Sequence, residues 1–203
     1  MKLKICGMKY ADNIREVAKI YPGFMGFIFF SKSKRYVGED FVMPEISSEI
    51  KKVGVFVNDS IENISAKANK HKLDFIQLHG DETSQFCRSV HKNVNVIKAF
   101  GIDDDFDFSV LKQYENCCEY FLFDTKSNEY GGSGKEFDRN ILWNYKLSKP
   151  YFLSGGISIE EVRSQKPELR NAFALDVNSK FETKPGFKDL NKLKLLKDEL
   201  SGK

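Results

Sequence analysis

Cysteine, histidine and aspartate residues follow or end several short apolar runs of this chain. Cys6 follows the opening run, His79 and Asp124 each follow a later one, and Asp176 lies within the last run. A thiolate can remove a proton from carbon when nearby cations or dipoles bring the pKa of the thiol near 7. A carboxyl group held partly out of water can donate a proton. Cys6 and Asp124 are therefore the candidate base and acid.

Each of these residues also has a simpler interpretation. Most free cysteines are small buried hydrophobes, so Cys6 could serve packing alone. Asp124 could cap a turn. His79 could line a site or only order it. Asp176 could also cap a turn, but it lies next to the predicted phosphate helix, so a role in binding sugar hydroxyls is its natural functional interpretation.

A second group of residues is typical of phosphate binding. Gly155 and Gly156 follow an apolar run and open a helical pattern, where backbone N–H groups favour an anion, although Gly-Gly alone can be a tight turn. Asn178 and Ser179 follow the last run, and Ser179 has capping-box spacing to Glu182, which predicts a short extra helix. A glycine turn after strand seven with a short helix after strand eight is the recurrent phosphate site of barrels.

Two further segments, one basic and one rich in glycine, each allow more than one interpretation. Arg35 lies in a run of serines and lysines that is usually solvated surface, but it could also bind a substrate carboxylate through two hydrogen bonds. The run Gly131-Gly132-Ser133-Gly134-Lys135 resembles a phosphate loop, yet Glu136 stands where Ser or Thr would hold Mg²⁺. We interpret that run as a mobile loop beside the site.

The elements that would position these residues alternate between strands and helices. Helical patterns begin near Asp12, Asp59, Glu82 and Ser158, and a last one runs through the leucines from Leu190. The alternation predicts an α/β fold, a compact (β/α)8 TIM barrel forming a single domain over residues 1–203, in which some helices must be short or missing. The rival doubly wound sheet would show a glycine fingerprint after the first strand, which is not found here. The eight predicted strands are residues 3–5, 24–29, 52–57, 75–78, 94–99, 120–123, 151–153 and 172–177.

Composition excludes several other classes of protein. The net charge is only +3, and basic residues are not interleaved with aromatics, so we expect no nucleic-acid partner. The longest apolar run, residues 24–30, is too short to span a membrane, and the start of the chain is not a secretion signal. The four cysteines lack metal-ligand spacing, so we expect no metal site and a cytoplasmic location with free thiols.

At this point the chain resembles the phosphoribosylanthranilate isomerase family of tryptophan biosynthesis over almost its whole length. Any one of the shared motifs would be weak alone, but together and in family order they are specific. They are Lys4-Ile5-Cys6-Gly7-Met8, Gly26-Phe27-Ile28-Phe29, Ser33-Lys34-Arg35-Tyr36-Val37, Gly54-Val55-Phe56-Val57-Asn58, Ile76-Gln77-Leu78-His79-Gly80-Asp81-Glu82, Phe123-Asp124-Thr125, the run 131–135 with Phe137-Asp138, Leu153-Ser154-Gly155-Gly156-Ile157, and Asp176-Val177-Asn178-Ser179 through Pro185-Gly186-Phe187-Lys188-Asp189.

The resemblance implies a (β/α)8 barrel that converts N-(5-phosphoribosyl)anthranilate to 1-(2-carboxyphenylamino)-1-deoxyribulose 5-phosphate without a cofactor. Asp124 would then be the general acid, Cys6 the base and Arg35 the ligand of the anthranilate carboxylate. The phosphate cradle would be Gly155, Gly156, Asn178 and Ser179. The expected partner is this small-molecule phosphosugar substrate, and the chain would be a monomer or homodimer.

The chain departs from the family pattern at a few positions. Lys34 and Asn178 stand where proline and serine are common, Lys180 replaces a common glycine, and Arg139 stands where tryptophan is frequent. An ammonium at Lys180 could tighten phosphate binding, so Lys180→Gly is expected to raise KM several-fold, about 1 kcal/mol. The alternatives are a related phosphosugar isomerase or epimerase, and a non-catalytic phosphosugar-binding barrel.

Overall fold

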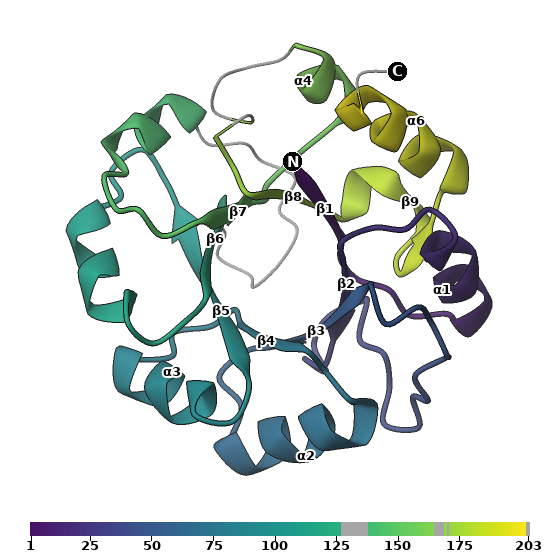
Figure 1. The fold of residues 1–203 in the computed structure, drawn as a ribbon, viewed down its shortest axis with the longest axis horizontal. Coiled ribbons are helices and arrows are strands. Elements are labelled where there is room, and N and C mark those ends of the chain that lie inside the picture. The colour runs from purple at the N-terminus through teal and green to yellow at the C-terminus, as the bar shows by residue number, and fades with distance from the viewer. Residues whose placement is uncertain (127–137, 165–168, 170, 202–203) are drawn as a thin grey trace.

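The computed structural model describes residues 1–126, 138–164, 169 and 171–201. Eight parallel strands form a closed barrel in chain order, and helices surround it (Figure 1). The ring closes where β8 pairs with β1 along four residues. The predicted (β/α)8 barrel is confirmed, while the glycine-rich run 131–135 lies outside the described residues.

The strands follow the predicted order, and their ends differ by at most three residues. β5 extends beyond the predicted end because it pairs with β6 as far as Ile102 and Thr125. The last strand begins two residues later than predicted. The barrel strands are β1 Lys2–Ile5, β2 Phe24–Ile28, β3 Lys51–Phe56, β4 Phe75–Leu78, β5 Asn95–Ile102, β6 Tyr120–Thr125, β7 Tyr151–Leu153 and β8 Ala174–Val177.

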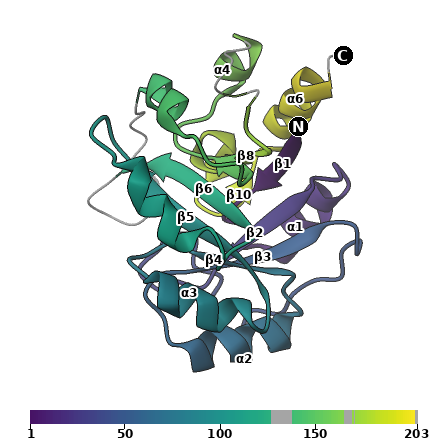
Figure 2. The ribbon, with the colours of Figure 1, turned by 60° about the vertical axis from the view of Figure 1, so that its left-hand side comes forward.

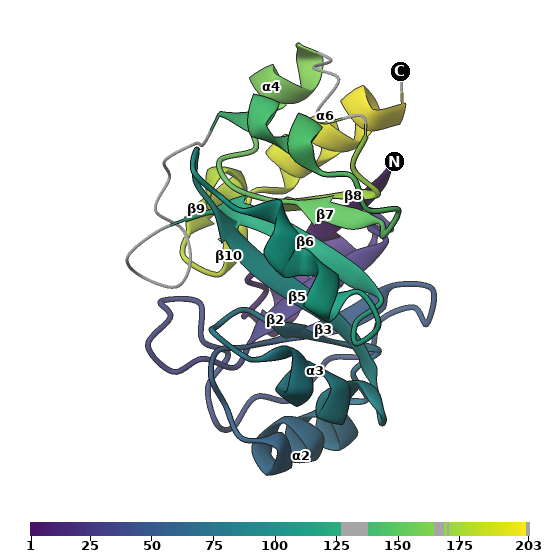
Figure 3. The same cartoon turned by 90° about the vertical axis from the view of Figure 1, so that its left-hand side faces the viewer.

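Three of the helices start at a serine or threonine whose side chain caps the first turn. Ser60 accepts the N–H of Asn63, Thr83 accepts that of Phe86, and Ser158 forms a full capping box with Glu161. In Figure 2, α2 and α3 lie side by side on the outside of the barrel, and Figure 3 shows α4 next to α6. The helices are α1 Ala11–Ala18, α2 Ile61–His71, α3 Ser84–His91, α4 Ile159–Arg163 and α6 Leu190–Ser201.

The barrel is compact because several connections carry no α-helix. Residues 29–50 pass from β2 to β3 through turns and coil. Two 3-10 helices, η1 Phe108–Tyr114 and η2 Arg139–Asn144, lie on the paths from β5 to β6 and from β6 to β7. The expectation of short or missing helices is therefore confirmed.

A short insertion follows β8. It consists of one 3-10 turn, η3 Ser179–Phe181, and an antiparallel hairpin formed by β9 Glu182–Lys184 and β10 Phe187–Lys188. The predicted extra helix is thus a single turn. The hairpin continues directly into α6, which returns along the outside of the barrel.

An aromatic layer fills the end of the barrel where the strands begin. Phe24, Phe75 and Phe152 are buried there, with Tyr120 and Phe173 packed against them. The Tyr120 and Phe173 rings stack with centroids 4.8 Å apart. Because this end is packed with rings, side chains that must meet a ligand have to lie at the opposite end, where the strands finish. No helix in the described part of the chain has the length and apolar content needed to cross a membrane.

Candidate active site

One cavity at the carboxyl ends of the strands collects all nine predicted site residues. It contains about 910 Å³ of empty space, part of it open to solvent. This is enough room for a ligand that combines a sugar phosphate with an aromatic ring. The predicted residues that line it are Cys6, Arg35, His79, Asp124, Gly155, Gly156, Asp176, Asn178 and Ser179.

Cys6 lies at the end of β1, and its backbone N–H donates to Val177 O at 2.9 Å. The side chain is buried, and its Sγ rests on Gly26 of β2 so closely that a Cβ there would lie 2.7 Å away. Burial raises the pKa of the Cys6 thiol; Lys4 and Lys188 oppose this effect, and Asp176 adds to it. In the free protein the loss of solvent outweighs the two lysines, so the pKa of Cys6 lies above its ordinary value.

Asp124 lies near the end of β6, and the two oxygens of its carboxyl group have different neighbours. Its Oδ1 accepts the N–H of Thr125 at 2.8 Å, and its Oδ2 lies 3.4 Å from His79 Nε2. The other ring nitrogen of His79 lies 2.6 Å from Gln77 Nε2. His79 therefore both lines the cavity and contacts the candidate acid, and Gln77 of β4 contacts the other nitrogen of its ring.

Asp176 points into the barrel from β8 and is 5% exposed. Its Oδ2 accepts from Lys4 Nζ at 2.8 Å. Its Oδ1 is buried and has no hydrogen-bond partner among the described residues. A buried carboxylate oxygen without a donor is costly, so this atom is well suited to accept a hydrogen bond from a ligand hydroxyl.

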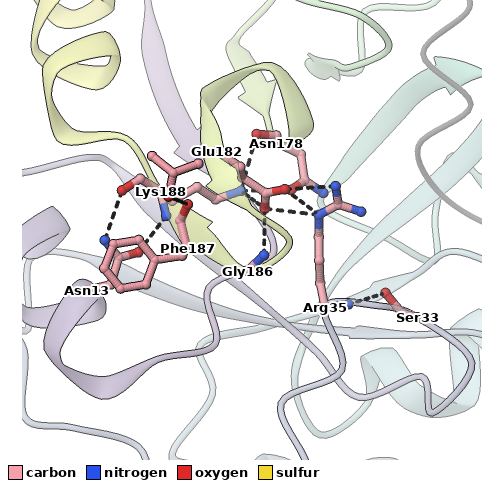
Figure 4. A network of polar contacts seen from close by, with 9 residues as sticks. Asn13, Ser33, Arg35, Asn178, Glu182, Gly186, Phe187 and Lys188 are labelled. Carbon is pink, nitrogen blue, oxygen red and sulfur yellow. Dashed lines mark hydrogen bonds and ion pairs between the residues drawn. The ribbon is translucent and has the colours of Figure 1, made fainter.

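Arg35 is held by Glu182, which the sequence analysis placed in a capping box with Ser179. Its Nε and Nη2 both donate to the Glu182 carboxylate, at 2.8–3.0 Å (Figure 4). Glu182 also accepts from Lys188 Nζ at 2.7 Å and from the Gly186 N–H at 3.1 Å. Burial raises the pKa of Glu182, but its bonds to Arg35 and Lys188 outweigh burial and hold this pKa below its usual value. The predicted capping box between Ser179 and Glu182 was wrong, because these two cations take the Glu182 side chain.

Lys188 fixes the start of the insertion after β8. Its ammonium donates to Asn178 Oδ1 at 2.7 Å, and its backbone exchanges hydrogen bonds with Asn13 of α1 (Figure 4). Burial lowers the pKa of Lys188 to about 8, against the opposing effect of Glu182. The Asn178 carbonyl oxygen also accepts from Lys188 Nζ at 3.3 Å and from the Phe181 N–H at 3.1 Å, so Lys188 holds both oxygens of this residue.

The glycine turn after β7 packs against the acid end of the site. Gly155 has a φ of +84°, and a Cβ there would lie 2.3 Å from Thr125 Oγ1. Gly156 has a φ of +67°. Arg139 Nη2 donates to Gly155 O at 2.7 Å, and its Nη1 lies 2.7 Å from Glu161 of α4. The turn thus needs glycine for both conformation and space, and Arg139 ties it to η2.

Sequence reasoning missed the charged residues that support the site. Glu182 and Lys188 lie in segments interpreted as a cap and a turn, and Lys4 was treated as part of an apolar strand. The alternation of Lys2-Leu3-Lys4-Ile5-Cys6 was the available signal, because residues two apart on a strand share a face. Among the described residues, no group of three or more His, Cys, Asp or Glu side chains could hold a metal ion.

Comparison with protein families gives a match over nearly the whole chain. The model described as N-(5'-phosphoribosyl)anthranilate (PRA) isomerase matches residues 3–199. A protein of that name from Parabacteroides distasonis is 45% identical over 200 residues, which cover 96% of this chain and 90% of the relative. The protein of the same name from Thermotoga maritima is 37% identical and covers 96% of each chain.

Solved structures give the same result for the fold. The phosphoribosylanthranilate isomerase structure from Thermotoga maritima superimposes with a TM-score of 0.87, at 34% identity and full coverage of both chains. Another phosphoribosylanthranilate isomerase was solved with reduced 1-(o-carboxyphenylamino)-1-deoxyribulose 5-phosphate and has a TM-score of 0.81 at 29% identity, again over both whole chains. The chain described here belongs to the N-(5'-phosphoribosyl)anthranilate isomerase family.

Proposed function

We propose that the chain performs its family's reaction with Cys6 as the base and Asp124 as the acid. The reaction is the Amadori rearrangement of N-(5'-phosphoribosyl)anthranilate to 1-(2-carboxyphenylamino)-1-deoxyribulose 5-phosphate. The observation that carries the assignment is that one cavity holds a thiol, a carboxyl group, an arginine and a glycine turn at the ends of four different strands or their loops. A relative of the same fold has been solved with a reduced form of this product.

The chemistry requires one proton donor and one proton acceptor. Asp124 protonates the furanose ring oxygen, the C1–O bond breaks, and the nitrogen lone pair forms a protonated Schiff base. The Cys6 thiolate then removes the proton from C2, and the electrons of that bond neutralise the nitrogen to give an enolamine. Protonation at C1 and loss of the O2 proton give the ketone. Cys6 then gives up the proton from C2 and Asp124 takes up a new proton, each by exchange with solvent, so both groups return to their starting states after one turnover.

The two ends of the substrate are held by different parts of the cavity. Arg35 binds the anthranilate carboxylate with the edge of the guanidinium that Glu182 does not occupy. The phosphate lies between Gly155 and Gly156 on one side and Asn178 and Ser179 on the other. Lys180 also lines the cavity from its exposed position and adds a positive charge near the phosphate.

Asp176 holds the sugar between these ends. Its buried Oδ1 accepts a hydrogen bond from a ribose hydroxyl, which supplies the donor that the described residues do not. His79 contacts Asp124 and keeps the acid oriented toward the ring oxygen. We expect the enzyme to work in the cytoplasm as a monomer or a homodimer.

The direct test follows substrate fluorescence. Phosphoribosylanthranilate is made in situ from anthranilate and phosphoribosyl pyrophosphate with a transferase, and its decay is measured with and without this protein. We expect fast decay with the natural chain and a loss of kcat by orders of magnitude in Cys6→Ser and in Asp124→Asn. Circular dichroism checks that both variants are folded.

The outcomes separate the activity from the mechanism. Fast decay that survives in both variants would keep the activity and overturn the acid and base assignments. A folded natural chain that gives no acceleration would overturn the activity and favour another phosphosugar isomerase or a binding protein.

A further inference from the structure

A lysine ammonium lies inside the barrel directly beside the proposed base. Lys4 is fully buried on β1, two residues before Cys6, and both side chains point to the barrel interior. Its register partner on the adjacent strand is Asp176, and the two side chains form an ion pair at 2.8 Å. Because Cys6 follows Lys4 by two positions, the ammonium and the thiol share the interior face, and the charge of Lys4 opposes the rise that burial causes in the pKa of the Cys6 thiol.

Packing does not explain this residue. Burial of an ion pair carries a large desolvation penalty, and apolar residues of similar volume often stabilise the fold equally well or better. Lys4 stands among apolar neighbours Leu3 and Ile5, yet its two polar partners are both residues of the proposed site. Burial lowers the pKa of Lys4, but Asp176 and then Cys6 outweigh it, so the pKa stays above the ordinary value. Lys4 is therefore treated as the cation of the pair that it forms with Asp176 at 2.8 Å.

Among the described residues, the other cations near Cys6 are bound by further partners. Lys188 of β10 faces the thiol, but its ammonium is bound by Asn178 and Glu182. Arg35 packs beside Gly7, next in the chain to Cys6, and its guanidinium is held by Glu182. The charge of Asp176 acts on Cys6, and the charges of Asp124 and His79 act on Asp176 in turn. In the part of the chain that the structure describes, Lys4 is the cation that Cys6 and Asp176 share.

We propose that Lys4 is a positioning residue of the isomerase, whose ammonium holds Asp176 against the sugar and stabilises the Cys6 thiolate. The proposal rests on the proposed function for the roles of Cys6 and Asp176. When the Cys6 thiol loses its proton to solvent, the thiolate and the Asp176 carboxylate are two neighbouring negative charges, and the ammonium of Lys4 balances one of them. When the thiolate takes the C2 proton, the charge of Lys4 stays paired with Asp176. No proton passes through Lys4.

The test measures the ionisation of Cys6 in the protein without substrate. The rate of alkylation by iodoacetamide is followed against pH, mass spectrometry assigns the modified cysteine, and Cys6→Ser gives the background from the other three thiols. Lys4→Met should lower the thiolate fraction of Cys6 at pH 8 at least tenfold. Asp176→Asn should raise that fraction, because it removes the neighbouring anion.

A double variant keeps the test decisive if Lys4→Met fails to fold. The double variant, Lys4→Met with Asp176→Asn, removes both charges of the pair, so neither partner is left buried alone. Its fraction of Cys6 thiolate should be at least tenfold below that of the single variant Asp176→Asn. Equal fractions in these two proteins would overturn the proposal. The matched control is Lys98→Met with Glu82→Gln, which removes another buried pair, 2.9 Å apart, without changing Cys6.

Turnover gives a second measurement. In Lys4→Met the acid limb of the kcat/KM profile should move to higher pH, in step with the alkylation profile. A uniform loss of kcat with an unshifted profile would mean that Lys4 only supports the fold. Because alkylation requires no substrate, it tests Lys4 even if the proposed activity fails.

Discussion

At the scale of single residues, the thiol of Cys6 depends on the absence of a side chain at Gly26. A Cβ at Gly26 would lie 2.7 Å from Sγ and 3.1 Å from Cα of Cys6. Gly26→Ala should therefore displace the Cys6 thiol from its position in the cavity and lower kcat by about 10- to 100-fold. Overpacking should also lower the free energy of unfolding by about 1–3 kcal/mol. Steady-state kinetics and urea unfolding measure the two effects.

The control for this variant is another glycine of the same segment. At Gly23 a Cβ would have its nearest neighbour, Leu3 O, at 3.5 Å, which is ordinary contact. Gly23→Ala should leave kcat unchanged. If Gly26→Ala matched the natural enzyme, the thiol would not need its present position.

His71 makes protein stability depend on pH at a place remote from the chemistry. Its ring stacks on Phe29 with centroids 5.2 Å apart and tilts against Phe41 at 5.5 Å. Burial, and then Lys70 and Lys67, lower the pKa of His71 from 6.5. Below pH 6.5 the unfolded chain binds a proton that the folded protein resists, so stability should fall as pH drops below 6.5 and level off above it.

The test compares urea unfolding of the natural chain and His71→Gln at pH 7.5 and pH 5. The variant should be less stable at pH 7.5 because it loses the ring contacts. The difference should shrink at pH 5, where the natural chain has lost the contribution of neutral His71. A difference that stays constant with pH would contradict this account.

At the scale of elements, the glycine turn after β7 is fixed by a side chain from η2. Arg139 binds Gly155 O and the Glu161 carboxylate, and Glu161 completes the capping box of α4. Arg139→Met leaves Glu161 without its cation, and the expected loss of stability is about 2–3 kcal/mol, at the low end for a buried pair because Glu161 is partly exposed. Since Gly155 belongs to the proposed phosphate cradle, KM should rise several-fold while kcat changes less.

A nearby surface pair provides the control for Arg139. Arg163 lies on α4 and pairs with Glu199 at 2.7 Å, with both side chains substantially exposed. Arg163→Met should cost at most about 0.5 kcal/mol and leave KM unchanged. If the two variants had equal effects on KM, the link from Arg139 to the phosphate would be wrong.

At the scale of the whole molecule, we expect residues 1–203 to unfold as one domain. Far-UV circular dichroism follows all helices, while fluorescence follows Trp143, the single tryptophan, in η2. The two urea transitions should coincide, because a closed barrel loses its ring of strand pairs together. Separate midpoints would indicate two units. In solution the mass should be 23.4 kDa or twice that value.

The sequence by itself determined which residues reach one end of the barrel. Apolar runs mark the strands, and every parallel strand ends on the same side, so residues that close these runs must converge. Cys6, Asp124 and Gly155 could therefore be placed in one site without coordinates, and the structure has them lining one cavity. The short connections also followed from the length, since eight units had to share about 200 residues.

Only the tertiary structure decided the partners of these residues and hence their ionisation. Lys4 meets Asp176 because the first and last strands close the ring, across 172 positions of sequence. Glu182 has the spacing of a cap, but Arg35 binds it from a loop 147 positions away. The direction of the Cys6 pKa shift depends on burial and on three charges from three strands. Local pattern cannot supply these facts, because desolvation and ion pairing depend on which distant side chains the folded chain brings within a few ångströms.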